Sequence, residues 1–544
     1  MIIPRPEHPN PIFQRQNWQN LNGIWQFYCK EVPEKREILV PFCPESTLSG
    51  VEYTGFMKNL VYSRPFAVPK GWRGKNIILH FGAVDYHAAV YINGILAGTH
   101  KGGYTPFEFD ITAFVHEGEN ILTVNVTDDL MSGKQPSGKQ SKELNSYGCF
   151  YTRTTGIWQT VWLEAVPEKH IKTLKTTTDM AGNVRLEVET TSSGVVSASV
   201  CYAGREIVKT SGEGIIKFQV PEIHLWDVGQ GNLYDLTLTY GEDTVYSYFG
   251  LRSVELKDGA FLLNGRKVFG RWVLDQGFYP DGVYTAPTDE ELQNDIIYSM
   301  RLGFNGARLH QKIFEPRFLY HADRLGYMVW GEHANWGLDI SYKESVEHFL
   351  PEWLECLARD YSHPAIIGWC PFNETWDYEG KIQCDEVLRI VYNETKKFDR
   401  TRPVIDTSGN YHVVTDIFDI HDYNQSINEF SDHYEGNKVF LNFTERQTYN
   451  GEPYFVSEYG GIKWSDDETG WGYGDAPKSR EEFLDRYTRL TTALLNNKNV
   501  LGFCYTQLYD IEQEQNGLLT YRRDFKFNPE IIYKINTQKA AIED

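Results

Sequence analysis

The sequence predicts a multidomain chain, β plus α/β, in which two β-sandwiches precede a C-terminal (β/α)8 TIM barrel. Three observations support this prediction. Residues 1–167 contain many short apolar or alternating runs that are separated by turn signals and show no helical periodicity. Residues 168–253 continue with runs that alternate at period two. From residue 254 onward, short apolar runs alternate with amphipathic helical patterns, as in a barrel of parallel strands.

The first region, residues 1–167, is predicted to be a jelly roll. Its apolar runs include Asn76–Phe81, Ala89–Ile92 and Asn120–Val126. Asn93-Gly94 directly follows one of these runs and is a strong signal for a tight β-hairpin. Many short strands without helices are typical of a sandwich or a jelly roll.

The second region, residues 168–253, is predicted to be an immunoglobulin-like β-sandwich. The runs Leu186–Glu189, Val196–Val200 and Leu233–Tyr240 alternate at period two. A unit of about 85 residues with such strands fits this fold. We find no residue with a chemical role in this region and expect it to be a structural spacer.

The third region, residues 254–544, is predicted to be the barrel. Thr288 and Ser479 each precede an acidic residue by three positions, which is the capping-box signal for a helix start. Two segments without periodicity, Glu429–Gly451 and Gly460–Pro477, are expected to be long loops, and such loops are often functional. The eight expected strands, the count of a closed barrel, are Lys267–Gly270, Asn305–Arg308, Tyr327–Trp330, Ile366–Trp369, Pro403–Ile405, Ile417–His421, Tyr454–Val456 and Val500–Cys504.

Composition and charge exclude several classes of partner. The chain carries 53 basic and 74 acidic residues, which argues against nucleic acid or an anionic membrane as the main partner. The eight cysteines show neither CxxC spacing nor a regular framework, so reduced thiols without a metal or another cofactor are expected. No signal peptide and no apolar run of about 18 residues is visible. This predicts a cytoplasmic protein, and a periplasmic location stays open if a signal was removed.

Two predicted barrel strands end in a glutamate. Glu374 follows the apolar run Ala365–Ile367, with Asn373 beside it, and Glu458 follows the run Pro453–Ser457. Catalytic groups of such barrels lie at the carboxyl ends of the strands. A single glutamate at such a position is more often a solvated loop acid. The pair favours carboxylate-pair chemistry, as in glycoside hydrolysis.

Three motifs together resemble glycoside hydrolase family 2, the family of β-galactosidases, β-glucuronidases and β-mannosidases. They are Thr155–Glu164, the strand-end pair Asn373-Glu374, and Ser457–Gly460. The order of a sugar-binding-like jelly roll, an immunoglobulin-like domain and a barrel also resembles that family over the whole chain. The resemblance implies a retaining mechanism in which Glu458 is the nucleophile and Glu374 is first the general acid and then the general base. It further implies that the Asn373 amide binds the sugar 2-hydroxyl. The alternative is that this amide only caps its own loop.

Other residues near the predicted strand ends are candidates for binding the sugar. Their polar groups could bond hydroxyls or orient a carboxylate, and buried side chains that bridge barrel layers are the alternative. Trp336 and Trp464 are candidates for stacking on a sugar ring, and Asp85 matches a polar residue that family members lend from the first domain. The remaining candidates are Asp275, Arg308, His310, His421, Tyr423, Gln507, Glu514 and Asn516.

Departures from the family's motifs bear on the substrate. Family β-glucuronidases bind the uronate carboxylate with an Asn-x-Lys pair before a Gly-Ile-Phe-Thr-like segment, and here Glu514 and Asn516 precede Gly517–Thr520. A carboxylate at Glu514 would repel a uronic acid, so β-glucuronidase is disfavoured. Asn335–Gly337 stands where larger β-galactosidases supply magnesium ligands, so no metal site is expected. A pentose or furanoside substrate stays open.

The leading hypothesis is a retaining exo-β-glycosidase that removes a terminal neutral sugar and is β-galactosidase-like. The runner-up activities are β-glucuronidase and α-L-arabinofuranosidase. A carbohydrate-binding protein with an inactive barrel is the alternative from another class, but it predicts a missing carboxyl group and both are present. Sugar binding by residues 1–167 alone is a further alternative. A carbohydrate is the expected partner, and the family implies a homo-oligomer, a dimer or a tetramer.

Overall fold

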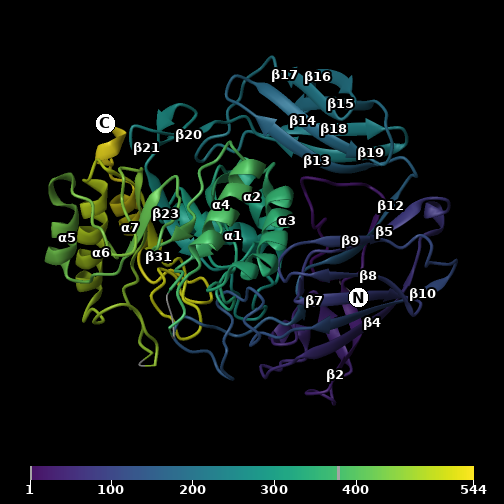
Figure 1. Ribbon diagram of the computed structural model, residues 1–544, viewed down its shortest axis with the longest axis horizontal. Helices are drawn as coiled ribbons and strands as arrows, with labels where there is room; N and C mark the ends of the chain where they lie inside the picture. The colour runs from purple at the N-terminus through teal and green to yellow at the C-terminus, as the bar shows by residue number, and fades with distance from the viewer. Residues whose placement is uncertain (1–2, 377–379, 468) are drawn as a thin grey trace.

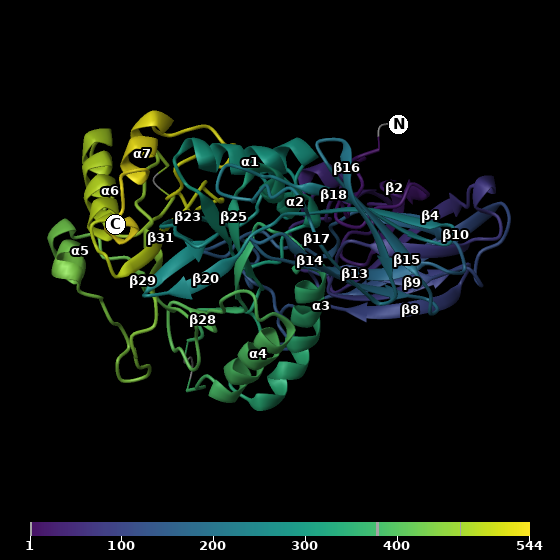
Figure 2. The same cartoon turned by 90° about the horizontal axis from the view of Figure 1, so that it is seen from above.

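The computed structural model describes residues 3–376, 380–467 and 469–544, which form three parts (Figure 1). In this view the barrel lies at the left, the jelly roll at the lower right, and the immunoglobulin-like sandwich above the jelly roll. Seen from above, the barrel again lies beside the two sandwiches (Figure 2). The predicted fold class, two β-sandwiches followed by a parallel barrel, is therefore confirmed.

The jelly roll consists of two antiparallel sheets and a short strand pair. The predicted hairpin is confirmed, because Asn93 and Gly94 connect β7 to β8 with φ angles of 52° and 79°. The four-stranded sheet contains β1 (Trp18–Asn20), β12 (Val161–Val166), β5 (Asn76–Phe81) and β9 (Phe107–Asp110). The six-stranded sheet contains β3 (Glu37–Val40), β2 (Gly23–Cys29), β4 (Asn59–Ala67), β10 (Glu119–Thr127), β7 (His87–Ile92) and β8 (Ile95–Lys101), and the pair is β6 (Val84–Asp85) with β11 (Gly156–Ile157).

The immunoglobulin-like sandwich packs two antiparallel sheets face to face. Alternate residues of β18, such as Leu236 and Leu238, are buried between the sheets, and this is why the sequence shows period two. One sheet contains β13 (Ile171–Thr178), β14 (Asn183–Thr190) and β17 (Ile215–Gln219). The other contains β16 (Arg205–Gly212), β15 (Val196–Tyr202), β18 (Tyr234–Tyr240) and β19 (Asp243–Phe249).

The barrel is built on a seven-stranded parallel sheet. Both faces of these strands are covered, so β25 and β30 are buried along their whole length. In spatial order the strands are β26 (Ile366–Cys370), β25 (Met328–Glu332), β24 (Gly306–Leu309), β23 (Gly270–Asp275), β31 (Val500–Thr506), β30 (Tyr454–Gly460) and β29 (Phe418–Asp422). A parallel pair, β27 (Phe372–Asn373) with β28 (Thr407–Ser408), lies between β26 and β29 in chain order, and β28 contacts β29.

Helices surround this sheet. The predicted helix starts are confirmed, because the hydroxyls of Thr288 and Ser479 accept hydrogen bonds from the third residue of α1 and of α6. The helices are α1 (Asp289–Arg301), α2 (Pro316–Leu325), α3 (Leu350–Asp360), α4 (Asp385–Phe398), α5 (Ile427–Tyr434), α6 (Arg480–Leu495) and α7 (Pro529–Asn536). No helix in the described ranges is long and apolar enough to span a membrane.

Three predictions about the barrel need correction. The first strand is β23, not Lys267–Gly270, because Lys267 is exposed in an antiparallel ribbon of β20 (Val254–Lys257), β21 (Ala260–Leu263) and β22 (Arg266–Lys267). The run Pro403–Ile405 makes only a bridge, between Val404 and Trp369, and the regular pairing comes later, at β28. Glu429–Gly451 is not wholly irregular, because α5 begins before it and is capped by Ser426.

Candidate active site

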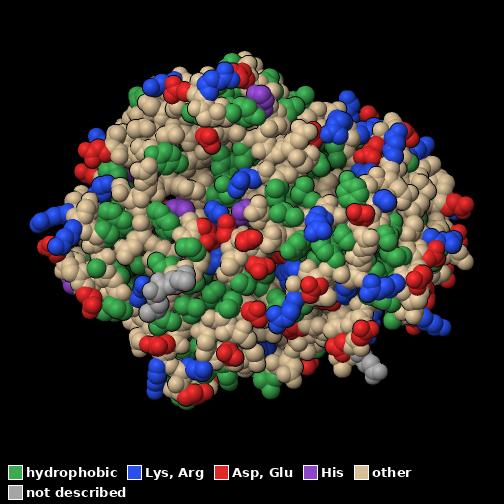
Figure 3. Space-filling view, turned by 180° about the vertical axis from the view of Figure 1, so that it is seen from behind, with side chains coloured by type: hydrophobic (Ala, Val, Ile, Leu, Met, Phe, Trp, Pro, Cys, Tyr) green, Lys and Arg blue, Asp and Glu red, His purple; other side chains and the backbone are tan. Residues whose placement is uncertain are grey.

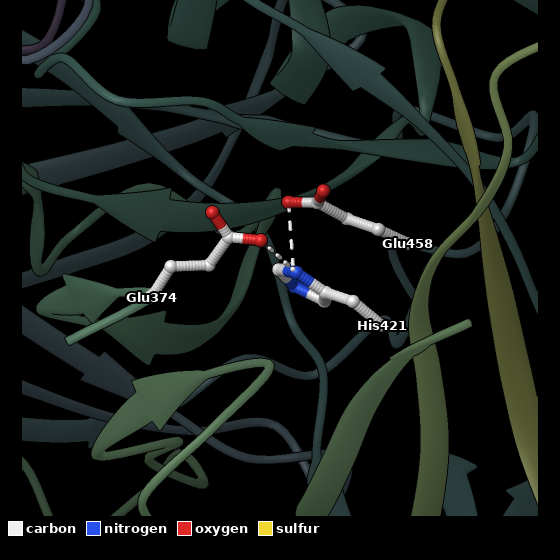
Figure 4. Close-up of side chains that lie close together, drawn as sticks. All are labelled: Glu374, His421 and Glu458. Atoms are coloured by element: carbon white, nitrogen blue, oxygen red, sulfur yellow. Dashed lines mark hydrogen bonds and ion pairs between the residues drawn. The ribbon is translucent and has the colours of Figure 1, made fainter. Parts of the chain in front are cut away.

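The two predicted glutamates meet at the carboxyl ends of the barrel strands. Glu374 directly follows β27, and Glu458 lies near the end of β30. His421 of β29 stands between them, with Nδ1 2.7 Å from Oε1 of Glu374 and Nε2 3.3 Å from Oε1 of Glu458 (Figure 4). One oxygen of each carboxylate and one imidazole nitrogen all lie within 4.8 Å of one another.

Glu374 has an uncommon backbone conformation. Its φ angle is 45°, a region that few residues other than glycine adopt. Its N–H donates to the carbonyl of Ser408 at 2.9 Å, which ties the residue to β28. Such strain is typical of functional sites, where the surrounding structure holds a residue in a costly conformation.

Arg308 of β24 holds the other glutamate in place. It is fully buried, and its Nη1 donates to Oε1 of Glu458 at 3.0 Å and to the carbonyl of Ser457 at 2.9 Å. Its Nε pairs with Glu332 at 2.7 Å and its Nη2 donates to Oδ1 of Asn373 at 3.0 Å. One guanidinium therefore orients Glu458 and Asn373 together.

Two further predicted residues complete this layer. The Tyr423 hydroxyl donates to Oε2 of Glu458, and the Tyr423 ring is stacked on Tyr473 at 3.5 Å between centroids. His310 lies 3.1 Å from Glu332, and burial followed by the charge of Lys139 lowers the pKa of His310, so the ring is neutral.

Asn373 and Trp336 lie beside the carboxyl pair. The indole Nε1 of Trp336 donates to the Asn373 carbonyl at 3.1 Å. The Asn373 Nδ2 group is buried and has no hydrogen-bond partner among the described residues. An unpaired amide donor at this place is able to bind a sugar hydroxyl, as the resemblance implies.

The electrostatics of the pair are dominated by His421. Burial raises the pKa of Glu374, but the hydrogen bond and positive charge of His421, together with Lys139, outweigh burial and lower it below its usual value. Burial lowers the pKa of His421, but the carboxylates of Glu458 and Glu374 outweigh burial and raise it. In the free site, the proton of the His421–Glu374 hydrogen bond therefore lies toward the imidazole, and it must move to Glu374 before Glu374 can act as the acid.

The three predicted residues after β31 form one network. Asn516 donates to Oε1 of Glu514 at 3.0 Å, and Gln507 donates to Oδ1 of Asn516 at 2.9 Å. The Tyr151 hydroxyl, from the jelly roll, donates to Oε2 of Glu514. Burial raises the pKa of Glu514, although Lys139 and these hydrogen bonds oppose the effect of burial.

Three other candidates have contacts away from the carboxyl pair. The carboxylate of Asp275 accepts from Gly277 N at 3.0 Å, and burial and Asp295 raise the pKa of Asp275 to about 6. Trp464 is partly buried and packs on Phe483 and Phe527, with a T-shaped and a tilted ring contact. Asp85 is fully buried under the jelly roll, where it accepts from Gln140 at 2.8 Å.

The residues that the jelly roll does bring to the site were not predicted. Lys139, Cys149 and Tyr151 belong to the segment between β10 and β11. The charge of Lys139 acts on Glu374, Glu458 and Glu514. The available signal was the length of this segment, which has no strand pattern inside an otherwise all-β region.

The chemistry of this cluster favours proton transfer over metal binding. Among the residues that the structure describes, Glu374, His421 and Glu458 are close enough to be considered for a metal ion. However, the 2.7 Å between His421 and Glu374 is a hydrogen-bond distance. Two ligands about 2 Å from a zinc ion would be roughly 3.3 Å apart. The three groups are therefore arranged to share protons.

A barrel with two carboxyl groups this close at its strand ends, preceded by two β-sandwiches, defines a glycoside hydrolase. The chain belongs to glycoside hydrolase family 2. The family's sugar-binding-domain model matches residues 46–167, its second model matches 164–252, and its TIM-barrel model matches 254–526.

Named relatives fall into two groups. A β-galactosidase of Thermoanaerobacterium thermosulfurigenes is 27% identical over 429 residues, which cover 74% of this chain and 57% of that protein. A β-glucuronidase of Streptococcus agalactiae is 22% identical over 503 residues, covering 82% of this chain and 83% of that protein. Several curated relatives are longer, and the chain spans about half of their length. The solved β-D-glucuronidase of Dictyoglomus thermophilum has the same fold, with a TM-score of 0.79, 20% identity, and coverage of 98% of each chain.

Proposed function

We propose that this protein is a retaining exo-β-glycosidase in which Glu458 is the nucleophile and Glu374 is the acid and base. The observation that carries the proposal is the short separation, within 4.8 Å, between oxygens of the two carboxylates. Retaining enzymes need carboxyl groups about 5 Å apart, whereas inverting enzymes need roughly 6.5–9.5 Å to admit a water molecule.

The two steps use the residues around the pair. In the first step, a Glu458 oxygen bonds to the anomeric carbon, the glycosidic C–O bond breaks, and Glu374 gives its proton to the leaving oxygen. In the second step, Glu374 takes a proton from water, and the water oxygen replaces Glu458 at the anomeric carbon. Arg308 and Tyr423 direct the nucleophile, and the free Asn373 amide is a donor for a sugar hydroxyl.

For the sugar, we favour a terminal β-glucuronide, with a β-galactoside as the second candidate. The relatives include both β-galactosidases and β-glucuronidases, which supports both sugars as candidates. The solved structures with the same fold are β-glucuronidases, which supports the β-glucuronide. The objection that Glu514 repels a uronic acid is weakened, because Tyr151 and Asn516 occupy both of its oxygens. The β-galactoside remains a candidate because Asn516 stands where the family's lysine is expected.

The test is a panel of nitrophenyl glycosides with the product anomer followed by proton NMR. We expect β-glucuronide to be cleaved fastest and the β-anomer of the free sugar to appear first. The α-anomer appearing first would exclude the retaining mechanism. Faster cleavage of β-galactoside would select the second candidate, and cleavage of no member of the panel would reject an exo-β-glycosidase for these sugars.

A further inference from the structure

The jelly roll sends a long segment across the barrel mouth. We call residues 128–155, between β10 and β11, the insert. Ser137 N and Gly138 N both donate to the Trp336 carbonyl, at 2.7 and 3.0 Å. Gly138 has a φ angle of 56°, and a Cβ atom on it would lie 2.4 Å from the Gln311 carbonyl oxygen. Only glycine fits this approach, so the docking of the insert is built into the sequence.

The other arm of the insert is fixed to the loops that follow β30 and β31. The indole of Trp471 and the amide of Gln513 both donate to the Gly148 carbonyl, at 2.6 and 2.7 Å. Tyr151 N donates to the Lys139 carbonyl at 2.7 Å, which ties the two arms together. The insert is thus held at both ends, and Lys139 is fixed between them.

Lys139 is a buried cation inside the site. Lys139 is only 7% exposed, and its Nζ lies 4.3 Å from the centroid of the Trp336 ring. Burial lowers the pKa of Lys139, but the neighbouring Cys149 sulfur and the carboxylates of Glu514 and the catalytic pair outweigh burial and raise it, so it is an ammonium. In the described part of the chain, the carboxylates act on the ammonium only through their charge, and its side-chain hydrogen bond is to Cys149.

Two other charged residues near the mouth, Arg308 and Glu514, are already paired. The Arg308 guanidinium donates hydrogen bonds to Glu332, Glu458 and Asn373. Both oxygens of Glu514 accept from neighbouring donors. A buried cation without a directly paired carboxylate is costly, and an anionic group on a ligand would offset that cost. On the face of the molecule shown in Figure 3, acidic, basic and histidine side chains gather near the middle.

We propose that Lys139 binds the carboxylate of a terminal uronic acid, so that the jelly roll, not the barrel, supplies the cation that selects the sugar. This inference rests on the proposed glycosidase function. Lys139 replaces the absent barrel lysine at the position of Asn516. Its ammonium also lies over one face of the Trp336 ring, so this face supports the lysine and is not available for stacking on a sugar ring.

The test compares Lys139→Met with a control, Lys142→Met. Lys142 is an exposed lysine of the same insert. We measure kcat/KM for nitrophenyl β-glucuronide and β-galactoside, and the affinity of free glucuronate by calorimetry. For Lys139→Met we expect the ratio of kcat/KM for the glucuronide to kcat/KM for the galactoside to fall about 100-fold, which is the effect of losing one buried charge pair. The affinity for free glucuronate should fall by the same factor. Lys142→Met should keep the wild-type ratio. Lys139→Arg is the second variant if the methionine variant does not fold, and it should retain part of the preference.

Three results would overturn the inference. Equal losses on both sugars would mean that Lys139 acts on the catalytic carboxylates. Unchanged glucuronate affinity in Lys139→Met would remove the lysine from the binding site. A wild-type enzyme that cleaves galactoside but not glucuronide would reject the uronate ligand while the glycosidase proposal stands. By contrast, full turnover in Glu458→Ala would reject the proposed function itself.

Discussion

The barrel contains two clusters in which a histidine lies between two carboxylates. In one, Nδ1 of His412 is 2.7 Å from Asp406 and its Nε2 is 3.2 Å from Asp419. In the other, His421 lies between Glu374 and Glu458 at 2.7 and 3.3 Å. The residue types and distances are nearly the same, yet only the second cluster is our candidate for chemistry.

The difference lies in burial and access to a ligand, since Oδ1 of Asp419 has only its ion pair with His412 among the described residues. Asp406 also accepts from the backbone N–H groups of Thr407, Val413 and Val414. Asp419 accepts from the Ser408 hydroxyl at 2.6 Å. Both aspartates are fully buried, whereas the Glu374 side chain is 18% exposed. The first cluster has no place for a ligand, and the second opens to one.

A charged triad does not by itself indicate catalysis. Burial lowers the pKa of His412, but Asp406 and Asp419 outweigh burial and raise it to about 10, so this cluster is a fixed ion network. The His421 cluster instead has longer side chains, an exposed acid, and Lys139 acting on it from another domain. Access for a ligand separates a reactive cluster from a structural one.

The largest expected effect comes from Glu458→Ala. Removing a nucleophile should lower kcat by about 10⁴-fold or more, since no covalent intermediate forms. Azide or formate, small enough to enter the space left by the side chain, should restore part of the turnover with inverted product. Thermal unfolding should show a folded protein. Normal activity without added anion would exclude Glu458 as the nucleophile. The His421 cluster would then have no more claim to catalysis than the His412 cluster.

Glu374→Ala should have the next largest effect, and its size should depend on the leaving group. Substrates with poor leaving groups need a proton from the acid and should slow by about 10²- to 10⁴-fold. Aryl glycosides with acidic phenols need little help and should slow far less in the glycosylation step. A Brønsted plot of kcat/KM against the phenol pKa measures this, and equal losses across the series would contradict an acid role.

His412→Asn should lower stability rather than catalysis. Without the imidazolium, Asp406 and Asp419 are buried charges without a cation, which costs about 3–5 kcal/mol of unfolding free energy. Because the pKa of His412 is raised to about 10 in the folded state, this stabilisation is fully present below about pH 6.5 and is lost as the pH rises toward 10. The difference from wild type in urea unfolding should therefore shrink between these pH values. His87→Asn, an exposed control, should show no such difference.

The strand-end rule explains how much of the site the sequence could predict. Glu374, Glu458, Arg308, His421 and Tyr423 lie together because parallel strands of one barrel end at the same rim. The rule needs only the position of each strand, and an error of a few residues, as at β28, does not change the rim. The rule does not apply to Asp85, which was expected only from the family resemblance, because a sandwich has no common rim of parallel strand ends.

Other residues could not be predicted because the sequence contains no signal for their contacts. Lys139 reaches the site from a segment without periodicity, and its neighbour Glu514 is far away in the chain. Trp464 lies in a loop. A loop has neither the helical nor the strand periodicity of apolar residues, so its sequence does not reveal whether an indole packs inward or toward a ligand. The docking of the insert depends on the close approach of Gly138 to Gln311, which only coordinates reveal.

The smallest expected effect, and the sharpest test of the comparison, comes from His421→Asn. The hydrogen bond and charge of His421 lower the pKa of Glu374 in the free site, so removing the imidazole should raise that pKa. Glu374 would then keep its proton to higher pH, and the alkaline limb of the kcat/KM profile, which reports the free enzyme, should move upward. We expect kcat at the optimum to fall by about 10- to 100-fold, because the two carboxylates lose their shared orienting group. Urea unfolding should change much less than in His412→Asn, since Glu374 is partly exposed and Glu458 keeps Arg308 and Tyr423. An unmoved alkaline limb, or a stability loss equal to that of His412→Asn, would make the His421 cluster another structural network.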